Sequence, residues 1–297
     1  MSGVGSARTL LKSVVIVAVI LVVLGLVALV AIRLFTGQVL GLRRLVQLGK
    51  AVIDSSTVAS YSHGDLTNVV FLHHSTGENL IEQGDVRERF SQAGYDFWDH
   101  GYNSSGLRRP DGTATGYSYL VPDNNTDPDG LARISGQRAY KLPLNTFSGL
   151  LQHEVIIFKS CFPVSNITSD EQLEEYKSYY LAMRDVMDQH LDKLFVVMTP
   201  PPLNPAETTA EAAVRARAFA DWLRSDEYLS GHANVTTFDF FDYLAEADPT
   251  LPDYNMLREA YREGSDSHPN AMANGIIGPL FVDFVVDAIE SYRARGQ

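Results

Sequence analysis

A serine that follows a strand-like run is the first residue whose type and position suit covalent chemistry. The run Asn68–His73 reads NVVFLH and then breaks at His74-Ser75-Thr76-Gly77. A serine at a strand-to-helix turn can present its hydroxyl above a sheet, where the first amides of the helix favour a developing anion. Serine is also a common residue at helix starts, so this segment alone leaves both interpretations open.

A second group of suitable residues precedes the last apolar stretch. The segment Gly264–Asn270 reads GSDSHPN and places Asp266 two residues before His268. Serine is a weak nucleophile until a base takes its proton, and the base works best when a carboxylate orients it. Taken alone, a histidine before a proline is an ordinary helix start. Together with the early serine, however, the pattern predicts that Ser75, His268 and Asp266 are catalytic.

Short apolar runs alternate with helical stretches from residue 65 onward. The strand candidates are 68–73, 95–99, 154–159, 194–199 and 234–240. The helix candidates are 79–93, 169–190, 208–229 and 270–293. This alternation predicts a parallel sheet covered by helices on both faces, and in such a sheet chemistry collects where strands end. Residues 103–137 form a long exception, rich in Gly, Asp, Asn and Ser, which we expect to shape the substrate pocket.

Two blocks resemble the SGNH/GDSL hydrolases: FLHHSTG at Phe71–Gly77 and DSHPN at Asp266–Asn270. The resemblance runs from about Asn68 to Ala294 and includes a proline-rich loop after the fourth strand. It implies an α/β fold, a three-layer α/β/α sandwich around a five-stranded parallel sheet of flavodoxin-like type. It also implies hydrolysis of acyl or acetyl esters, with the serine after the first strand as nucleophile and the late histidine as base.

The sequence departs from the family pattern around both blocks. Histidines stand where the family has small and acidic residues before the serine, so His74 is a candidate substrate-binding residue or a packing residue. Asp266 lies two residues before His268, where the family usually has three. Asp239 and Asp242 are therefore alternative carboxylates, and a serine–histidine dyad is a further alternative.

The resemblance also implies an oxyanion hole, built from a glycine amide after the second strand and an asparagine side chain after the third. Gly101 matches the glycine, with Gly106 as an alternative. No asparagine occupies the expected position after the third strand, so Asn166 is the candidate and Ser160 or Asn103 are alternatives. Asn103 is also a candidate substrate-binding residue. One such donor is worth roughly 3–4 kcal/mol to catalysis, so an active enzyme needs one.

The N-terminal region has the composition of a membrane segment. Residues 14–32 are apolar without a charge, and Lys12 and Arg33 bracket them. At about 1.5 Å per residue, a helix of that length spans the hydrocarbon core, so we predict an uncleaved single-pass anchor, with a cleaved signal peptide as the alternative. The predicted organisation is an N-terminal tail at 1–12, a transmembrane helix at 13–35, a juxtamembrane amphipathic helix and linker at 36–64, and an SGNH-hydrolase-like domain at 65–297.

The sequence gives conflicting indications of the side of the membrane on which the C-terminal domain lies. The positive-inside rule taken literally keeps the C-terminal domain in the cytoplasm. A helix over 39–53 with interspersed basic residues could instead lie on an anionic membrane surface on either side. We place the catalytic domain on the extracytoplasmic side.

Charge and cysteine content exclude several other functions. A net charge of −12 argues against nucleic acid as a partner, and a single cysteine excludes an internal disulfide. Asp123–Gly130 alternates oxygen ligands but lacks the glutamate that an EF-hand needs at its twelfth position. Neither metal nor cofactor is therefore expected, with calcium binding by this loop as the alternative. The sequence thus predicts a membrane-anchored serine ester hydrolase acting on a small ester, lipid or glycan ester. The alternative is a catalytically silent domain that binds ligands in the same cleft.

Overall fold

The computed structural model describes residues 57–122 and 127–296, with 19, 20, 22–28, 30, 46, 49, 50 and 53. The chain divides into two compact units, Met1–Gly49 and Lys50–Gln297. The strands of the second unit are β1 (Asn68–Leu72), β2 (Asp96–His100), β3 (Leu107–Arg108), β4 (Val155–Lys159), β5 (Leu194–Met198) and β6 (Val235–Phe238). Its helices are α3 (Ser75–Gln83), α4 (Val86–Gln92), α5 (Pro128–Ser135), α6 (Thr146–Leu150), η2 (Phe162–Ser165), α7 (Asp170–Met187), α8 (Ala210–Leu223), α9 (Asp226–Leu229), α10 (Phe240–Leu244), η3 (Glu259–Tyr261) and α11 (Ala271–Arg295).

The strands form one mixed sheet in the order β3-β2-β1-β4-β5-β6. The five runs predicted from the sequence are present as β1, β2, β4, β5 and β6, and these five strands pair with one another in parallel. The predicted total of five strands is wrong, because β3 adds a sixth, antiparallel edge strand. This strand lies inside the segment predicted to be a loop, which also contains α5.

The sixth strand exists because the chain reverses at Gly106. That residue has φ +68°, a left-handed conformation that glycine adopts without strain. A Cβ there would lie 2.4 Å from the carbonyl oxygen of Tyr117, so the returning chain also needs the absence of a side chain. A two-residue strand carries no hydrophobic period, which is why the sequence pattern did not reveal it.

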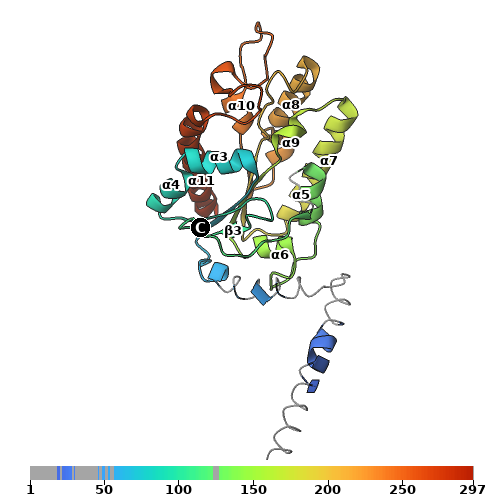
Figure 1. Ribbon diagram of the computed structural model, residues 1–297, viewed down its shortest axis with the longest axis vertical. Helices are drawn as coiled ribbons and strands as arrows, with labels where there is room; N and C mark the ends of the chain where they lie inside the picture. The colour runs from blue at the N-terminus through green and yellow to red at the C-terminus, as the bar shows by residue number, and fades with distance from the viewer. Residues whose placement is uncertain are drawn as a thin grey trace, which may run out of the picture. The chain divides into compact units, whose positions relative to one another are not determined.

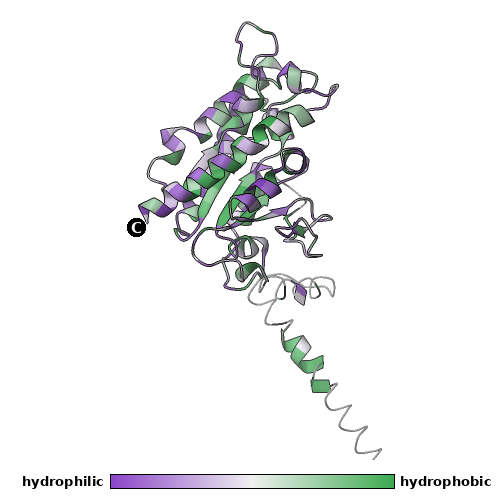
Figure 2. Ribbon diagram, turned by 90° about the vertical axis from the view of Figure 1, so that its left-hand side faces the viewer, coloured by the Kyte–Doolittle hydropathy of each residue, from purple (hydrophilic) through white to green (hydrophobic). Residues whose placement is uncertain are grey.

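Helices cover both faces of the sheet (Figure 1). Alternating residues of β1 explain the two layers: Val70 and Leu72 belong to a core shared with α5, α7 and α8, whereas Val69 and Phe71 belong to a core shared with α3, α4 and α11. Figure 2 shows apolar strands enclosed by helices whose polar residues face outward. The α/β sandwich predicted from the sequence is therefore present.

The carboxyl ends of three neighbouring strands meet at one edge. Leu72 of β1 lies opposite His100 of β2 and opposite Phe158 of β4. The segments that begin at His73, Gly101 and Ser160 consequently leave the sheet side by side. This edge is where the predicted nucleophile and oxyanion residues emerge.

Helix α11 packs very closely against the end of α3. Gly278 faces Gly84, and a Cβ at Gly278 would lie 2.4 Å from the carbonyl oxygen of Gly84. Two glycines let the two backbones touch, which holds α3 and its first residue, Ser75, against the sheet.

Among the described residues, one helix is long and apolar enough to cross a membrane, and it is α11 rather than the predicted anchor. Phe281, Val285 and Ile289 of α11 are fully buried in the core, so packing on the sheet accounts for its hydropathy. Of the predicted span 14–32, the structure describes 19, 20, 22–28 and 30, which are helical and exposed, and the rest lies outside the described residues. The N-terminal anchor and the predicted domain limits stay predictions.

Candidate active site

Ser75 is the first residue of α3, directly after the loop that leaves β1. The preceding residue, His74, has an extended backbone (φ −129°) and its side chain makes no capping hydrogen bond to the helix. Ser75 therefore lies inside the first turn and does not act as the N-cap. First-turn amides have no carbonyl partner within their own helix, so the Ser75 N–H is a potential donor.

Three side chains that the sequence analysis selected lie in one hydrogen-bonded line. Nε2 of His268 is 2.7 Å from Oγ of Ser75, across 193 residues of sequence. Nδ1 of His268 is 2.7 Å from Oδ1 of Asp266. A carboxylate can only accept a hydrogen, so Nδ1 carries the proton and Nε2 is left to accept from the serine hydroxyl. This order of atoms is the one that general-base activation of a serine requires.

The carboxylate at the end of this line is unusually open to solvent. The side chain of Asp266 is 56% exposed, and that of His268 is 27% exposed. Burial raises the pKa of Asp266, but hydrogen bonds from the ring and the backbone amide of His268 outweigh it and hold this pKa below its ordinary value. Asp266 is therefore ionised at neutral pH, in an environment where water screens its charge.

The segment that carries Asp266 and His268 is held by hydrogen bonds from the loop after β5. The Asn204 side chain donates to the carbonyl oxygens of Gly264 and Asp266, both at 3.1 Å. The Asn204 backbone amide donates to Oγ of Ser267 at 2.9 Å, and that hydroxyl donates in turn to Glu207. Ser267 and Asn204 were not identified from the sequence. The available signal in the sequence was that successive side chains of an extended segment point to opposite sides, which turns Ser267 away from Asp266 and His268.

The alternative carboxylates lie elsewhere and are paired with arginines. Asp239 caps α10 through the amide of Asp242 and forms a 2.6 Å ion pair with Arg224. Asp242 forms a 2.7 Å ion pair with Arg217. Of the carboxylates considered, Asp266 is the one that contacts the ring of His268.

The two predicted oxyanion residues, Gly101 and Asn166, lie in different surroundings. Gly101 follows β2 at the same sheet edge as Ser75 and is buried. A Cβ added to Gly101 would lie 3.5 Å from Cε1 of the His73 ring. Asn166 ends the short helix η2, and its Oδ1 accepts a hydrogen bond from Thr208 at 3.2 Å. Phe162 of η2, which the sequence analysis did not select, packs edge-on against His268 with ring centroids 4.9 Å apart.

The two predicted substrate-binding residues are both tied to the loop after β2. His74 is buried and stacks on Tyr102, with ring centroids 4.1 Å apart. Burial, together with the charges of Lys159 and His73, lowers the pKa of His74 to about 4, so its ring is neutral at physiological pH. Asn103 donates to the carbonyl of Val121 at 2.8 Å and accepts from that residue's amide at 2.9 Å, which closes the loop.

Lys159 ends β4 beneath this edge and is 1% exposed. Its Nζ donates to the carbonyl of Ser160 at 3.3 Å, and no carboxylate of the described segments lies within ion-pair distance of it. Burial lowers the pKa of Lys159. The end of β4 therefore carries a buried amine that has no carboxylate partner among the described residues.

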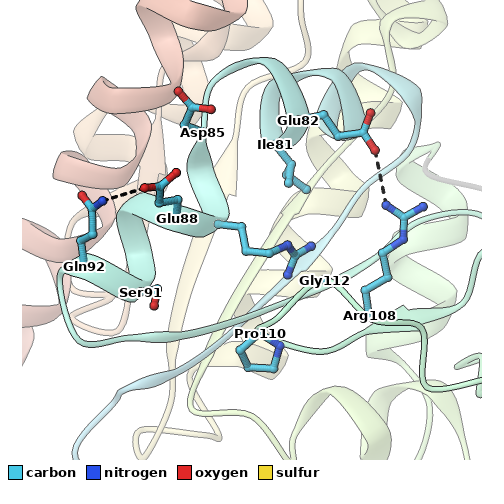
Figure 3. Close-up of a pocket in the computed structure, with 10 residues that line it drawn as sticks. Ile81, Glu82, Asp85, Glu88, Ser91, Gln92, Arg108, Pro110 and Gly112 are labelled. Carbon is cyan, nitrogen blue, oxygen red and sulfur yellow. Dashed lines mark hydrogen bonds and ion pairs between the residues drawn. The ribbon is translucent and has the colours of Figure 1, made fainter.

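A separate open groove of about 590 Å³ lies between α3, α4 and the β3 hairpin (Figure 3). Two pairs of its polar residues contact each other, the Glu82–Arg108 ion pair and the Gln92–Glu88 hydrogen bond drawn there. None of the predicted site residues lines it. Across the described part of the chain, no three His, Cys, Asp or Glu residues cluster in a way that could hold a metal ion, and the predicted acidic run at 123–130 lies partly outside that part.

Comparison with known proteins finds likeness in structure alone. No family model and no curated protein matches the sequence. A candidate acylhydrolase from Bacteroides fragilis is 11% identical with a TM-score of 0.49, over 79% of this chain and 95% of that one. A GDSL-like lipase from Bacteroides thetaiotaomicron is 9% identical with a TM-score of 0.47, over 80% of this chain and 98% of that one. These are likenesses of fold at TM-scores below 0.5, and no argument about family or activity rests on them.

Proposed function

We propose that this protein is a serine ester hydrolase of the SGNH type. The observation that carries the proposal is the continuous hydrogen-bonded line from Asp266 through His268 to Ser75, with 2.7 Å at each contact. An ordinary structural serine at a helix start would cap its own helix, whereas this hydroxyl points to a histidine from the other end of the chain. Nucleophilic acyl transfer is the chemistry for which this arrangement is suited.

In the proposed reaction, Oγ of Ser75 attacks the ester carbonyl while Nε2 of His268 takes its proton. The resulting tetrahedral intermediate carries its negative charge on the former carbonyl oxygen. His268 then donates the proton to the leaving alcohol, and an acyl-serine remains. A water molecule, deprotonated by the same nitrogen, attacks the acyl-serine and releases the carboxylic acid and the free serine.

The backbone amides of Ser75 and Gly101 are the proposed donors to the oxyanion. Both emerge from neighbouring strand ends of one sheet edge, and the amide of Ser75 has no partner within its helix. The contribution of Asn166 stays a prediction, since its Oδ1 is engaged by Thr208 and only its NH₂ group would be available. His74 and Asn103 are proposed to shape the pocket wall.

The test is hydrolysis of p-nitrophenyl acetate and butyrate by the full-length protein in detergent micelles, combined with fluorophosphonate labelling. Ser75→Ala and His268→Ala should each lower kcat by about 10⁴-fold, with the double variant little worse, because the residues act as a unit. Ser178→Ala, an exposed serine of α7 outside the segment 103–137, is the matched control and should retain full activity. Unchanged activity of Ser75→Ala overturns the mechanism. Wild-type protein that neither hydrolyses esters nor reacts with the probe would favour the silent binding domain.

We also propose that residues 14–32 anchor this hydrolase in a lipid bilayer. The proposal is supported by the uninterrupted apolar run and by the exposed apolar side chains of its described residues, such as Leu24 and Val27. Full-length protein should stay with membranes through a carbonate wash. Recovery of intact full-length chain in the soluble fraction would contradict the anchor, and protease accessibility in whole cells decides the side.

A further inference from the structure

A chain of buried charged groups ends directly beneath the peptide that precedes the nucleophile. The ring of His73, 1% exposed, lies between two oxygens: Nδ1 is 2.9 Å from the carbonyl oxygen of His74, and Nε2 is 3.1 Å from Oδ2 of Asp99. Asp99, 2% exposed, is also ion-paired with Arg87 of α4. None of these groups takes part in the reaction steps described above.

The surroundings of His73 place a hydrogen on both of its ring nitrogens. A carbonyl oxygen only accepts hydrogen bonds, so Nδ1 is the donor to His74. Burial raises the pKa of Asp99, but the hydrogen bond and charge of His73 and the charge of Arg87 outweigh it and hold this pKa below its ordinary value. Asp99 is then a carboxylate that also only accepts, and Nε2 is its donor. His73 is therefore an imidazolium held between an anion and a peptide carbonyl.

Neighbouring groups keep the ring in one place. Arg87 donates to the carbonyl of Phe97 at 3.0 Å and to that of Arg109 at 2.8 Å, which ties α4 to β2 and to the β3 hairpin. Gly77 of α3 packs directly on this side chain, since a Cβ there would lie 2.5 Å from Cβ and 2.9 Å from Cγ of His73. Of the charged and titratable groups around His73, burial lowers the pKa of both His74 and His100, and the charge of His73 lowers them further. The rings of His74 and His100 are therefore neutral at physiological pH.

The carbonyl that His73 contacts belongs to the same peptide group as the amide of Ser75. That carbonyl also accepts the amide of Glu78 at 2.9 Å, so both of its lone pairs are engaged. Hydrogen bonds polarise one another along a chain, and a peptide whose oxygen is bound to a cation donates more strongly from its nitrogen. The nitrogen in question is the one proposed above to face the oxyanion.

We propose that His73, held by Asp99 and Arg87, is a positioning residue that orients and polarises the His74–Ser75 peptide as an oxyanion-hole donor. This inference rests on the proposed function. It explains why histidine stands where a smaller residue would suffice for the turn. It also assigns a role in the transition state to a side chain that never contacts the substrate.

The test separates stabilisation of the transition state from simple loss of packing. His73→Phe keeps a buried ring but removes both hydrogen bonds, whereas His73→Asn keeps a donor near the position of Nδ1. Removing an oxyanion donor outright costs about 10²–10³-fold, so weakening one should lower kcat by about 10- to 30-fold in His73→Phe, with KM little changed. A boronic acid that forms a tetrahedral adduct with Ser75 should lose affinity by the same factor, while the product alcohol should not. His73→Asn should recover part of both losses.

Two further variants keep the proposal falsifiable. Asp99→Asn preserves the shape of the site if His73→Phe fails to fold, and should lower kcat and boronate affinity together. His153→Phe is the matched control, because His153 is fully buried with both ring nitrogens bonded, to Asn68 at 2.8 Å and to Tyr119 at 2.7 Å. It should lower the urea midpoint and leave kcat within about threefold, since it touches nothing near the nucleophile.

The outcomes are distinguishable from those that test the proposed function. A wild-type protein without Ser75-dependent hydrolysis overturns both. An active wild type whose His73→Phe and Asp99→Asn variants keep kcat within threefold overturns this inference alone. A fall in kcat that boronate affinity does not follow also overturns it, because packing loss would then be the cause.

Discussion

The exposure of Asp266 leads to a specific expectation for the Asp266→Asn variant. Two opposite charges 4 Å apart are worth about 1 kcal/mol in water and about 4 kcal/mol at an effective dielectric constant near 20. Because the side chains of Asp266 and His268 are 56% and 27% exposed, the pair lies near the aqueous limit, and we take about 1–2 kcal/mol after screening. At about 1.36 kcal/mol per tenfold in rate, kcat should fall by about 5- to 30-fold. In a buried triad the same change costs about 10⁴-fold.

The geometry also explains why the amide should preserve the tautomer. Oδ1 of Asp266 receives both the ring Nδ1 of His268, at 2.7 Å, and the backbone amide of His268, at 3.2 Å. An asparagine oxygen in the same place can accept from both donors, so its NH₂ group turns outward to solvent. The ring then keeps its proton on Nδ1 and still accepts from Ser75.

The assay is p-nitrophenyl acetate hydrolysis by full-length protein in micelles, with active sites counted by fluorophosphonate titration. Asp242→Asn is the matched control, since its carboxylate is 54% exposed and pairs with Arg217 away from the site. The ratio of wild-type to Asp266→Asn rates should shrink in 1 M salt, because exposed charges are screened. A loss of 10³-fold or more at unchanged melting temperature would refute the screening argument. A loss below twofold would show that Asp266 does not act.

Three further predictions test the supports of the site. Ser267→Ala should lower kcat about tenfold at unchanged KM, because it removes the Asn204–Ser267 hydrogen bond that holds the segment carrying His268. The exposed neighbour variant Ser265→Ala is the control and should keep the wild-type rate. Equal rates in the two variants would contradict a role for the Asn204–Ser267 contact. Gly278→Ala places a Cβ 2.4 Å from the carbonyl oxygen of Gly84, so it should lower the free energy of unfolding by about 1–3 kcal/mol. Urea unfolding measures this loss, and an unaltered midpoint would be inconsistent with the close packing of α11 on α3. Burial lowers the pKa of His100 and His153 to about 3, so the unfolded chain binds more protons as the pH falls from about 6.5 toward 3. The free energy of unfolding should drop through that window by up to about 1.4 kcal/mol per pH unit per histidine, and a pH-independent urea midpoint would refute this.

The sequence by itself determined the parallel part of the sheet. Runs such as NVVFL in β1 and LFVVM in β5 are buried on both faces, and continuous apolar runs between helical stretches are the local signature of that environment. It also identified the candidate site residues, because a serine after β1 and a histidine before α11 can be recognised from a few residues of local context. Each of these patterns is formed by residues that are adjacent in the chain, so it can be recognised without knowledge of the fold.

The tertiary structure decided which of the candidate groups lie together. Ser75 and His268 are 193 residues apart, and the packing of α3 on α11, including the close Gly84–Gly278 contact, brings them together. The choice of Asp266 over Asp239 followed from ion pairs with arginines that no spacing rule anticipates.

The antiparallel strand β3, the Asn204–Ser267 contact and the His73–Asp99 pair were likewise invisible in the sequence. Each depends on where a loop or a buried side chain meets a distant partner. Hydrophobic periodicity reports burial along one element, whereas polar partnerships across elements are set by the three-dimensional packing that burial produces.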